Sequence, residues 1–251
     1  RVHGAMLLNK MFPEIRFQYP KSLYAVRDTL RICTADKPNA LIVDFFAGSG
    51  TTLQAVNLLN AEDDGNRRCI MVTNNEVSEK EANSLIQQGF VPGDDEWEKL
   101  GIARYVTWPR TVCSIKGNDV NGKALEGEYY DSDLSMSEGF AANAEFFKLG
   151  FLDKTSVALG RQLKELFPIL WLKAGAHGPC PKFENDQAYI QIFPINKFAV
   201  LIDEKYFQEF DEQVRNNPEI QTIYIVTDSE GGYREMIPGY RDKDTYQLYR
   251  D

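Results

Sequence analysis

The clearest structural signal in this sequence lies at residues 40–52, ALIVDFFAGSGTT. Ala40–Phe46 is a nearly continuous apolar run of strand length, which is typical of a parallel strand buried on both faces. Gly48 and Gly50 permit a sharp turn, and Thr51–Asn60 has helical spacing. The segment therefore predicts a strand, a turn and a helix. Because a helix N-terminus offers unpaired N–H groups, the turn is expected to bind a ligand.

The glycine turn by itself does not identify the ligand. It is not a P-loop, because no lysine follows Gly50 and Phe45 stands at the position of the leading glycine. It is not a complete dinucleotide fingerprint either, because Leu53 stands where the third glycine belongs. A plain strand-to-helix turn is the alternative interpretation.

The flanking segments extend an α/β pattern. Ser22 is a suitable N-cap for a helix over 22–33, and Ser78 with Glu81 forms a capping box for a helix over 78–88 that Gly89 closes. Arg68–Thr73 is predicted as a second buried strand and Ile102–Trp108 as a third. Strands that alternate with helices at this spacing predict a doubly wound α/β sheet with right-handed crossovers.

Residues 117–140 break this pattern, because they are rich in glycine, asparagine, aspartate and serine and have no periodicity. We expect a linker or a long loop there, between a first domain over 1–116 and a smaller α/β domain over 141–251. Asp153–Leu166 is predicted as an amphipathic helix with Val157, Leu159, Leu163 and Leu166 inward, which Pro168 bends or ends.

The rest of the second domain is predicted in the order strand, strand, helix, strand. A hairpin is expected from Tyr189–Phe193 and Phe198–Ile202 around the turn at 194–197. Glu204–Arg215 is expected to form a helix and Thr222–Thr227 a further strand.

Composition excludes several classes of protein. The chain has 251 residues, 43% of them hydrophobic, and its longest apolar runs fall far short of the ~20 residues of a membrane helix. A net charge of −9 argues against a surface that binds nucleic acid everywhere, although a local basic groove remains compatible with it. The four cysteines are widely spaced without a CxxC pair, so we expect reduced thiols and a cytoplasmic protein.

Two further segments are expected beside the glycine turn. The stretch FQYPKS at 17–22 directly precedes the helix that leads to the glycine strand, and Glu76 follows the second strand. Because ligands bind at the carboxyl ends of parallel strands, we expect Glu76 and the turn to face one pocket, where a carboxylate can accept both hydroxyls of a ribose. The alternative for Glu76 is a solvated loop acid or a charge at a helix N-terminus.

With these residues the sequence resembles the amino-group DNA methyltransferases that use S-adenosylmethionine, especially the adenine-specific modification subunits of type III restriction systems. The resemblance implies an incomplete Rossmann-like methyltransferase sheet and, more weakly, the C-terminal domain of type III-like enzymes. It also implies that S-adenosylmethionine is bound by Tyr19, Pro20, Lys21, Ser22, Asp44, Phe45, Phe46, Gly48, Ser49, Gly50, Thr51, Thr52, Asn75 and Glu76.

One departure from the family concerns catalysis. The family holds the target amine with an Asp/Asn/Ser-Pro-Pro-aromatic motif, and this sequence contains no Pro-Pro dipeptide. Some members carry the motif N-terminal to the cofactor loop, so we expect it upstream of Arg1, in a parent protein of which this chain is an inactive fragment. The resemblance implies double-stranded DNA as a partner of the whole protein, with a homodimer or a restriction subunit as further partners.

Two alternatives to a methyltransferase remain open. The first is a non-catalytic cofactor- or nucleotide-binding module that acts in assembly. The second is another small-molecule enzyme with a similar sheet. A Pro-Pro motif in the parent protein favours the methyltransferase over both.

Other chemistry-bearing residues support weaker hypotheses. His177 and Cys180 offer two metal ligands, but a zinc site needs three or four, so we expect a loop and no metal site. Tyr129 and Tyr130 can stack on bases or pack their loop on the domain. The acidic run at 94–96 is best explained as a solvated charge cluster.

Basic residues follow the third predicted strand. Arg104 and Arg110 lie near the expected pocket edge, so Arg110 is a candidate for binding a phosphate. Packing of its stem on Trp108 at the surface is the equally weighted alternative.

Overall fold

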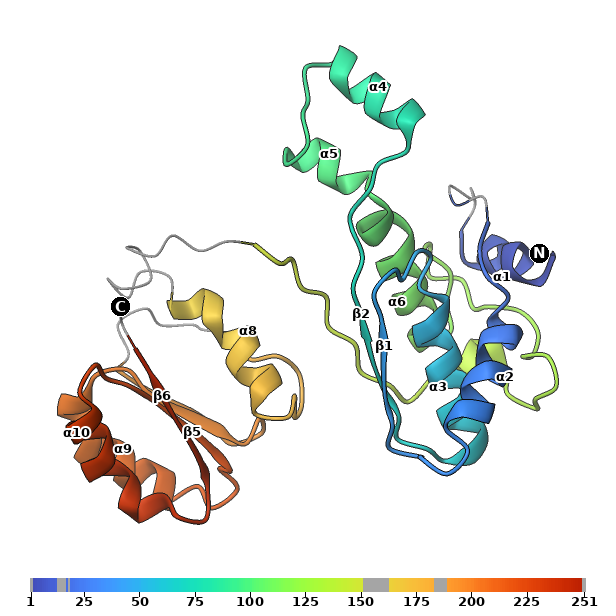
Figure 1. The fold of residues 1–251 in the computed structure, drawn as a ribbon. Helices are drawn as coiled ribbons and strands as arrows, with labels where there is room; N and C mark the ends of the chain where they lie inside the picture. The colour runs from blue at the N-terminus through green and yellow to red at the C-terminus, as the bar shows by residue number, and fades with distance from the viewer. Residues whose placement is uncertain (1, 13–16, 18, 151–162, 183–188, 250–251) are drawn as a thin grey trace. The chain divides into compact units, whose positions relative to one another are not determined.

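The computed structural model describes residues 2–12, 17, 19–150, 163–182 and 189–249. The chain divides into two compact units, Arg1–Ala144 and Glu145–Asp251 (Figure 1). Each unit builds its own hydrophobic core from its own helices and strands. Most of the helix predicted over 153–166 lies outside the described residues.

The first unit consists mainly of helices around a short sheet. Its strands are β1 (Leu41–Asp44) and β2 (Arg68–Met71). Its helices are α1 (Val2–Met11), α2 (Leu23–Cys33), α3 (Thr51–Asp63), α4 (Glu79–Gln87), α5 (Asp95–Lys99), the π-helical turn η1 (Ala103–Thr107), α6 (Trp108–Lys116) and the 3-10 turn η2 (Met136–Glu138). The helices α4 and α5 project beyond the carboxyl end of β2 (Figure 1).

The local helix signals are confirmed at both predicted caps. Ser22 accepts a hydrogen bond from the backbone N–H of Ala25 at the start of α2, at 3.5 Å. Ser78 accepts one from the backbone N–H of Glu81 at the start of α4, at 3.4 Å, and donates its hydroxyl proton to the Glu81 carboxylate. Gly89 follows α4 with a φ of 89°, as a helix-ending glycine does.

The strands β1 and β2 are parallel, with Val43 beside Ile70, but the expected burial on both faces is wrong. α3 packs against β2 on one face, whereas Val43, Ile70 and Val72 on the other face are between 44% and 49% exposed. Successive residues of a strand point to opposite faces, and most residues of β1 and β2 are apolar, so both faces of the sheet are apolar. In the described part of the chain, nothing covers the second face.

The third predicted strand is wrong. Ile102–Trp108 instead lies in the helical segment η1–α6, in which the N–H of Trp108 bonds to the carbonyl of Ala103. Pro109 has no N–H to donate, and the wider π-helical turn falls directly before it. Most of the buried positions are spaced three and four residues apart, and they are Ala103, Val106, Thr107, Arg110, Thr111, Cys113 and Ser114.

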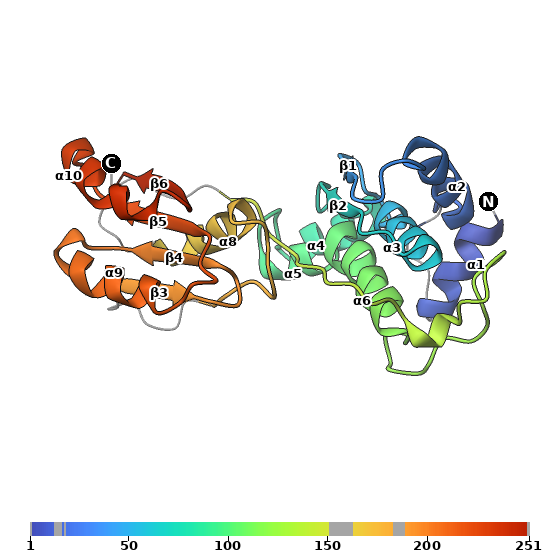
Figure 2. The same cartoon turned by 90° about the horizontal axis from the view of Figure 1, so that it is seen from below.

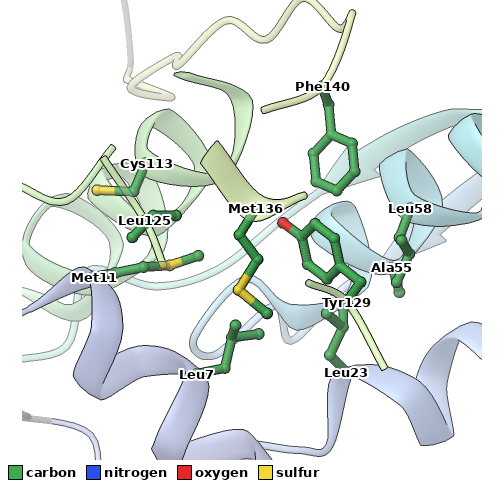
Figure 3. Close-up of a cluster of buried hydrophobic side chains, with 10 residues drawn as sticks. All are labelled: Leu7, Met11, Leu23, Ala55, Leu58, Cys113, Leu125, Tyr129, Met136 and Phe140. Atoms are coloured by element: carbon green, nitrogen blue, oxygen red, sulfur yellow. The ribbon is translucent and has the colours of Figure 1, made fainter. Parts of the chain in front are cut away.

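Residues 117–140 form a long irregular segment that packs on the first unit and does not connect two separate bodies. Its side chains complete the core between α1, α2, α3 and α6 (Figure 3). The residues that it buries there are Leu125, Tyr129, Met136 and Phe140. Burial of these apolar side chains explains how a segment without periodic structure keeps a fixed path.

The second unit contains a four-stranded mixed sheet in the order β3-β4-β5-β6 (Figure 2). β3 and β4 are antiparallel, and β4, β5 and β6 are parallel. The elements are α8 (Leu163–Lys173), β3 (Ile190–Phe193), β4 (Phe198–Leu201), η3 (Glu204–Tyr206), α9 (Phe207–Arg215), β5 (Thr222–Val226), α10 (Glu230–Met236), η4 (Ile237–Tyr240) and β6 (Asp244–Leu248).

The predicted hairpin, helix and strand of this unit are confirmed, and α10 and β6 extend the pattern. Alternate residues of β4 face opposite sides of the sheet: Ala199 packs with α9 and α10, and Val200 packs with α8. Pro168 does not end α8, which continues to Lys173. Helices therefore cover both faces of this sheet, and the molecule is an α/β protein with a parallel and a mixed sheet. Among the described helices, none is long and apolar enough to cross a membrane.

Candidate functional site

The glycine turn connects β1 to α3 in the first unit. Gly48 and Gly50 have φ angles of 52° and 76°, which only glycine adopts readily. The N–H of Gly50 bonds to the carbonyl of Ala47 at 2.8 Å, and the N–H of Ala47 bonds to the carbonyl of Val72 at 3.3 Å. The turn is therefore held at the carboxyl ends of both strands.

Asp44 organises the entrance to the turn. Its carboxylate accepts the N–H of Phe46 at 3.1 Å and the hydroxyl proton of Thr52 at 2.5 Å. The side chain thus links the end of β1 to the first turn of α3. A carboxylate has about four acceptor positions, so Asp44 retains capacity for a ligand.

The segment 17–22 lies beside this turn. A Cβ on Gly48 would have the Phe17 ring at 3.6 Å as its nearest neighbour, so the ring lies against the turn. Gly4 within α1 lets the chain come close, because a Cβ there would lie 2.6 Å from the Pro20 carbonyl oxygen and 2.7 Å from that of Lys21. A glycine in the first turn of α1 therefore allows the predicted cofactor segment to pack closely against this helix.

A hollow of about 660 Å³ lies between these two segments, within the size range of small-molecule sites. It is bounded by α2 on one side and by β1 with the start of α3 on the other. Six predicted site residues line it: Pro20, Lys21, Ser22, Asp44, Phe45 and Thr52. Its other lining residues are Ala25, Val26, Thr29, Leu30 and Val43.

The remaining predicted residues lie around the hollow in different ways. Tyr19 and Phe46 are 70% and 85% exposed, so their rings are accessible to a ligand. Ser49 and Thr51 have buried side chains that bond to Arg110 on α6, so these hydroxyls are directed into the protein.

The missing side chain of Gly50 leaves no room for a ligand. A Cβ at Gly50 would lie 3.1 Å from Cγ2 of Thr107 and 3.4 Å from its carbonyl oxygen. The space beside Gly50 is therefore occupied by α6 and its preceding π-helical turn. Gly48 has no such neighbour, because its Cβ would meet only ordinary contacts at 3.6 Å and beyond.

Asn75 and Glu76 follow β2 but do not line the hollow. The Asn75 amide is engaged: it donates to the Glu98 carbonyl at 2.7 Å and accepts the N–H of Arg104 at 3.2 Å. Gly101 leaves room for this amide, since a Cβ there would collide with it. Glu76 is exposed, and its backbone carbonyl accepts the N–H of Ile102 at 2.8 Å. Of the two, Glu76 has the accessible side chain.

Gln54 and Thr107 lie behind the turn and were not expected from the sequence, and Arg110, a candidate for binding a phosphate, lies there with them. Arg110 is fully buried, so the expected surface packing on Trp108 is wrong, and its guanidinium contacts protein oxygens. Burial lowers the pKa of Arg110 to about 10, because desolvation disfavours the charged form. The helical spacing of Thr107 with Arg110 was the available signal.

The other candidate residues have structural surroundings. Tyr129 is buried in the core and stacks on Phe140, whereas Tyr130 is 68% exposed. His177 and Cys180 lie in a loop, as predicted, and the described residues contain no group of His, Cys, Asp and Glu placed to hold a metal ion. In the acidic run at 94–96, Asp95 and Glu96 are exposed at the start of α5, whereas Asp94 precedes the helix, is partly buried and accepts the N–H of Val91 at 2.9 Å.

The first unit is thus an α/β unit with a small-molecule hollow at the carboxyl ends of parallel strands. The chain is similar to restriction-modification methyltransferases, which confirms the resemblance. It is 44% identical over 68 residues to the type II methyltransferase M.KpnI of Klebsiella pneumoniae. It is 43% identical over 68 residues to the Mod subunit of the type III enzyme EcoPI of Escherichia phage P1, and 34% identical over 84 residues to the StyLTI Mod subunit of Salmonella typhimurium.

These similarities cover a limited part of each protein. They span 27%, 27% and 31% of this chain, and 16%, 10% and 13% of the three relatives in the same order. No family-level sequence model matches the chain. The similarity therefore links the chain to DNA methyltransferases through a segment, and the activity of a whole protein is a matter for proposal.

Proposed function

We propose that this chain provides the S-adenosylmethionine-binding part of a DNA amino-methyltransferase, with adenine as the target base, in a restriction-modification system. The observation that carries the proposal is the hollow between Pro20–Ser22 and Asp44–Thr52. These segments were assigned to the same cofactor from separate motifs. The similarity to type III Mod subunits favours adenine over cytosine.

The lining of the hollow suits the methionine part of the cofactor. Val26, Leu30 and Val43 offer apolar surface to the methylene groups of this part. Lys21 and Asp44 place one cation and one anion in the same lining. An amino acid group carries both a carboxylate and an ammonium, so opposite charges in one site can hold it in a single orientation.

Glu76 is the candidate for the ribose hydroxyls. It follows β2, which is the parallel neighbour of the strand that ends at Asp44, and its carboxylate is exposed. A ribose in this position requires the ligand to extend from the hollow across the turn toward the end of β2. Asn75 supports this arrangement indirectly, because its amide ties the end of β2 to Glu98 and Arg104.

A Rossmann-like sheet is part of the proposal. Parallel β1 and β2 with a glycine turn and α3 form the beginning of such a sheet. The exposed apolar face at Val43 and Ile70 supports it, because a doubly wound sheet covers both faces with helices. The described residues contribute helices to one face only.

Base binding is assigned to the whole protein and not to the residues of this chain. The chain has no Pro-Pro dipeptide and hence no motif of the family type to hold a flipped base. Its net charge of −9 also argues against DNA binding by its general surface. We propose double-stranded DNA as the substrate, a second copy or a restriction subunit as a partner, and the cytoplasm as the location.

The test is calorimetric binding of S-adenosylmethionine and S-adenosylhomocysteine to the chain, with ATP and NAD as controls. We expect weak binding of the first two ligands, no competition by the controls, and no transfer of labelled methyl groups to DNA by the chain alone. Preferential binding of ATP or NAD would instead support the nucleotide-binding module. Methyl transfer without a Pro-Pro motif would contradict the division of roles proposed above.

A further inference from the structure

The segment η1–α6 contacts the glycine turn through the side chains of Thr107 and Arg110. Thr107 Oγ1 donates to the Gly48 carbonyl at 2.6 Å, and Arg110 Nη1 donates to the Ser49 carbonyl at 3.2 Å. Two successive peptide carbonyls are thereby fixed by side chains that lie about sixty residues further along the chain. The Thr107 methyl group also occupies the space beside Gly50.

Within the described part of the chain, Arg110 makes four hydrogen bonds, all of them to the glycine turn or to the first turn of α3. Besides the carbonyl of Ser49, Nη1 donates to Ser49 Oγ at 2.9 Å and to Thr51 Oγ1 at 2.8 Å, while Nε donates to Gln54 Oε1 at 2.9 Å. The guanidinium is fully buried, its Nη2 has no hydrogen-bond partner, and among the described residues no carboxylate forms an ion pair with it. A buried cation without a carboxylate is costly, and the four hydrogen bonds that offset this cost all go to the glycine turn and the first turn of α3.

The geometry of the peptide between Gly48 and Ser49 indicates what these contacts do. The peptide between Gly48 and Ser49 is trans, so its N–H points away from its carbonyl. Because Thr107 holds the carbonyl toward η1–α6, the N–H of Ser49 is directed to the opposite side. There it adds to the unpaired N–H groups at the start of α3, which attract a polar or negatively charged group.

We propose that Thr107 and Arg110 are positioning residues for the cofactor: they hold the glycine turn in the conformation that directs the N–H of Ser49 at the ligand. Neither side chain touches the ligand in this proposal, since both lie behind the turn. The inference rests on the proposed function for the identity of the ligand, S-adenosylmethionine, and on the contacts above for the mechanism.

The chain offers a matched control for each residue. Thr107→Val keeps the methyl group beside Gly50 but removes the hydroxyl, whereas Thr107→Ser keeps the hydroxyl. Arg110→Lys keeps the charge but cannot reach both the turn and Gln54. Arg67→Lys is its control, because Arg67 is another buried arginine, bonded to Thr34 and Asp63 at the opposite end of α3.

Two measurements test the proposal: S-adenosylhomocysteine affinity by calorimetry, and hydrogen exchange in the ligand-free chain of the Ala47 and Gly50 amides, which are hydrogen-bonded to the carbonyls of Val72 and Ala47. We expect Thr107→Val and Arg110→Lys to weaken binding about 10-fold and to speed exchange at the turn. Thr107→Ser and Arg67→Lys should keep the affinity within about twofold, even where Arg67→Lys lowers the melting temperature as much as Arg110→Lys.

Three outcomes are decisive. Unchanged affinity and unchanged exchange in Thr107→Val and Arg110→Lys would overturn the inference, as would equal losses of affinity in Arg110→Lys and Arg67→Lys. A wild-type chain that binds neither S-adenosylmethionine nor S-adenosylhomocysteine would count against the proposed function. In that case only the hydrogen exchange at the turn tests the inference. Faster exchange in Thr107→Val and Arg110→Lys supports it, and unchanged exchange overturns it.

Discussion

Replacement of Gly50 by alanine tests how the glycine turn is built. The structure gives Gly50 a φ of 76° and places Thr107 Cγ2 only 3.1 Å from an added Cβ. Gly48 has a φ of 52° but no neighbour closer than 3.6 Å to an added Cβ. The two glycines therefore share one conformational constraint and differ in the steric one.

The expected costs follow from these two terms. A left-handed φ lowers the free energy of unfolding by ~1–2 kcal/mol for a residue with a Cβ. The Cβ also reduces the conformational entropy of the unfolded chain, which raises the free energy of unfolding by ~0.4–1 kcal/mol. Crowding against Thr107 adds ~1–3 kcal/mol at Gly50 alone. We therefore expect Gly50→Ala to lower the free energy of unfolding of the first unit by about 2–4 kcal/mol and Gly48→Ala by about 1 kcal/mol.

The assay is urea unfolding followed by hydrogen exchange of peptides from α2, α3 and α6, with peptides from the second unit as an internal control. A double-mutant cycle isolates the contact: Gly50→Ala should cost ~1 kcal/mol less in a Thr107→Ser background, which lacks the crowded methyl group. Equal costs for the two glycines, or no coupling to Thr107, would refute the assignment of this space to Thr107.

Three further predictions concern other parts of the chain. Glu76→Gln should weaken S-adenosylmethionine binding about 10-fold by calorimetry if its carboxylate holds the ribose, and an unchanged dissociation constant would return Glu76 to the role of a solvated acid. Burial raises the pKa of Cys69 to about 12, so iodoacetamide at pH 8 should modify the exposed Cys33 far faster than Cys69. Because the folded state favours the protonated Cys69 thiol, the contribution of this thiol to the free energy of unfolding is full below pH 9 and is lost as the pH rises toward 12. Comparable alkylation rates at the two cysteines would contradict the burial. Asn196→Ala removes a hydrogen bond of 2.6 Å to the His177 carbonyl and should lower the melting temperature of the second unit, whereas a melting temperature equal to the wild type would show that this loop is held by other contacts.

Much of the local structure was predictable from short segments. Ser22 and Ser78 cap helices through their own side chains, so the signal and the structure lie within four residues of each other. The glycine turn after Asp44 is equally local, because its positive φ angles favour glycine. The hairpin over 189–202 follows from two apolar runs with a short turn between them.

The prediction of a strand over 102–108 was wrong because several buried positions of η1–α6 carry polar side chains. The inward face of η1–α6 includes Thr107, Arg110 and Ser114, so a pattern based on hydrophobicity does not reveal its helical period. The β-branched and aromatic residues over 102–108 resembled a strand instead. Burial of Arg110 is possible only because oxygens of Ser49, Thr51 and Gln54 meet it in three dimensions.

The sequence by itself determined the conformation of the glycine turn, the helices that flank it and the similarity to methyltransferases, because these depend on residues close together in the chain. Tertiary structure alone decided what each predicted residue does. It placed Pro20–Ser22 against Asp44–Thr52 around one hollow, engaged Asn75 with Glu98, and filled the space beside Gly50 with Thr107. The physical reason is that side-chain direction and burial are set by packing partners distant in sequence, which no local pattern specifies.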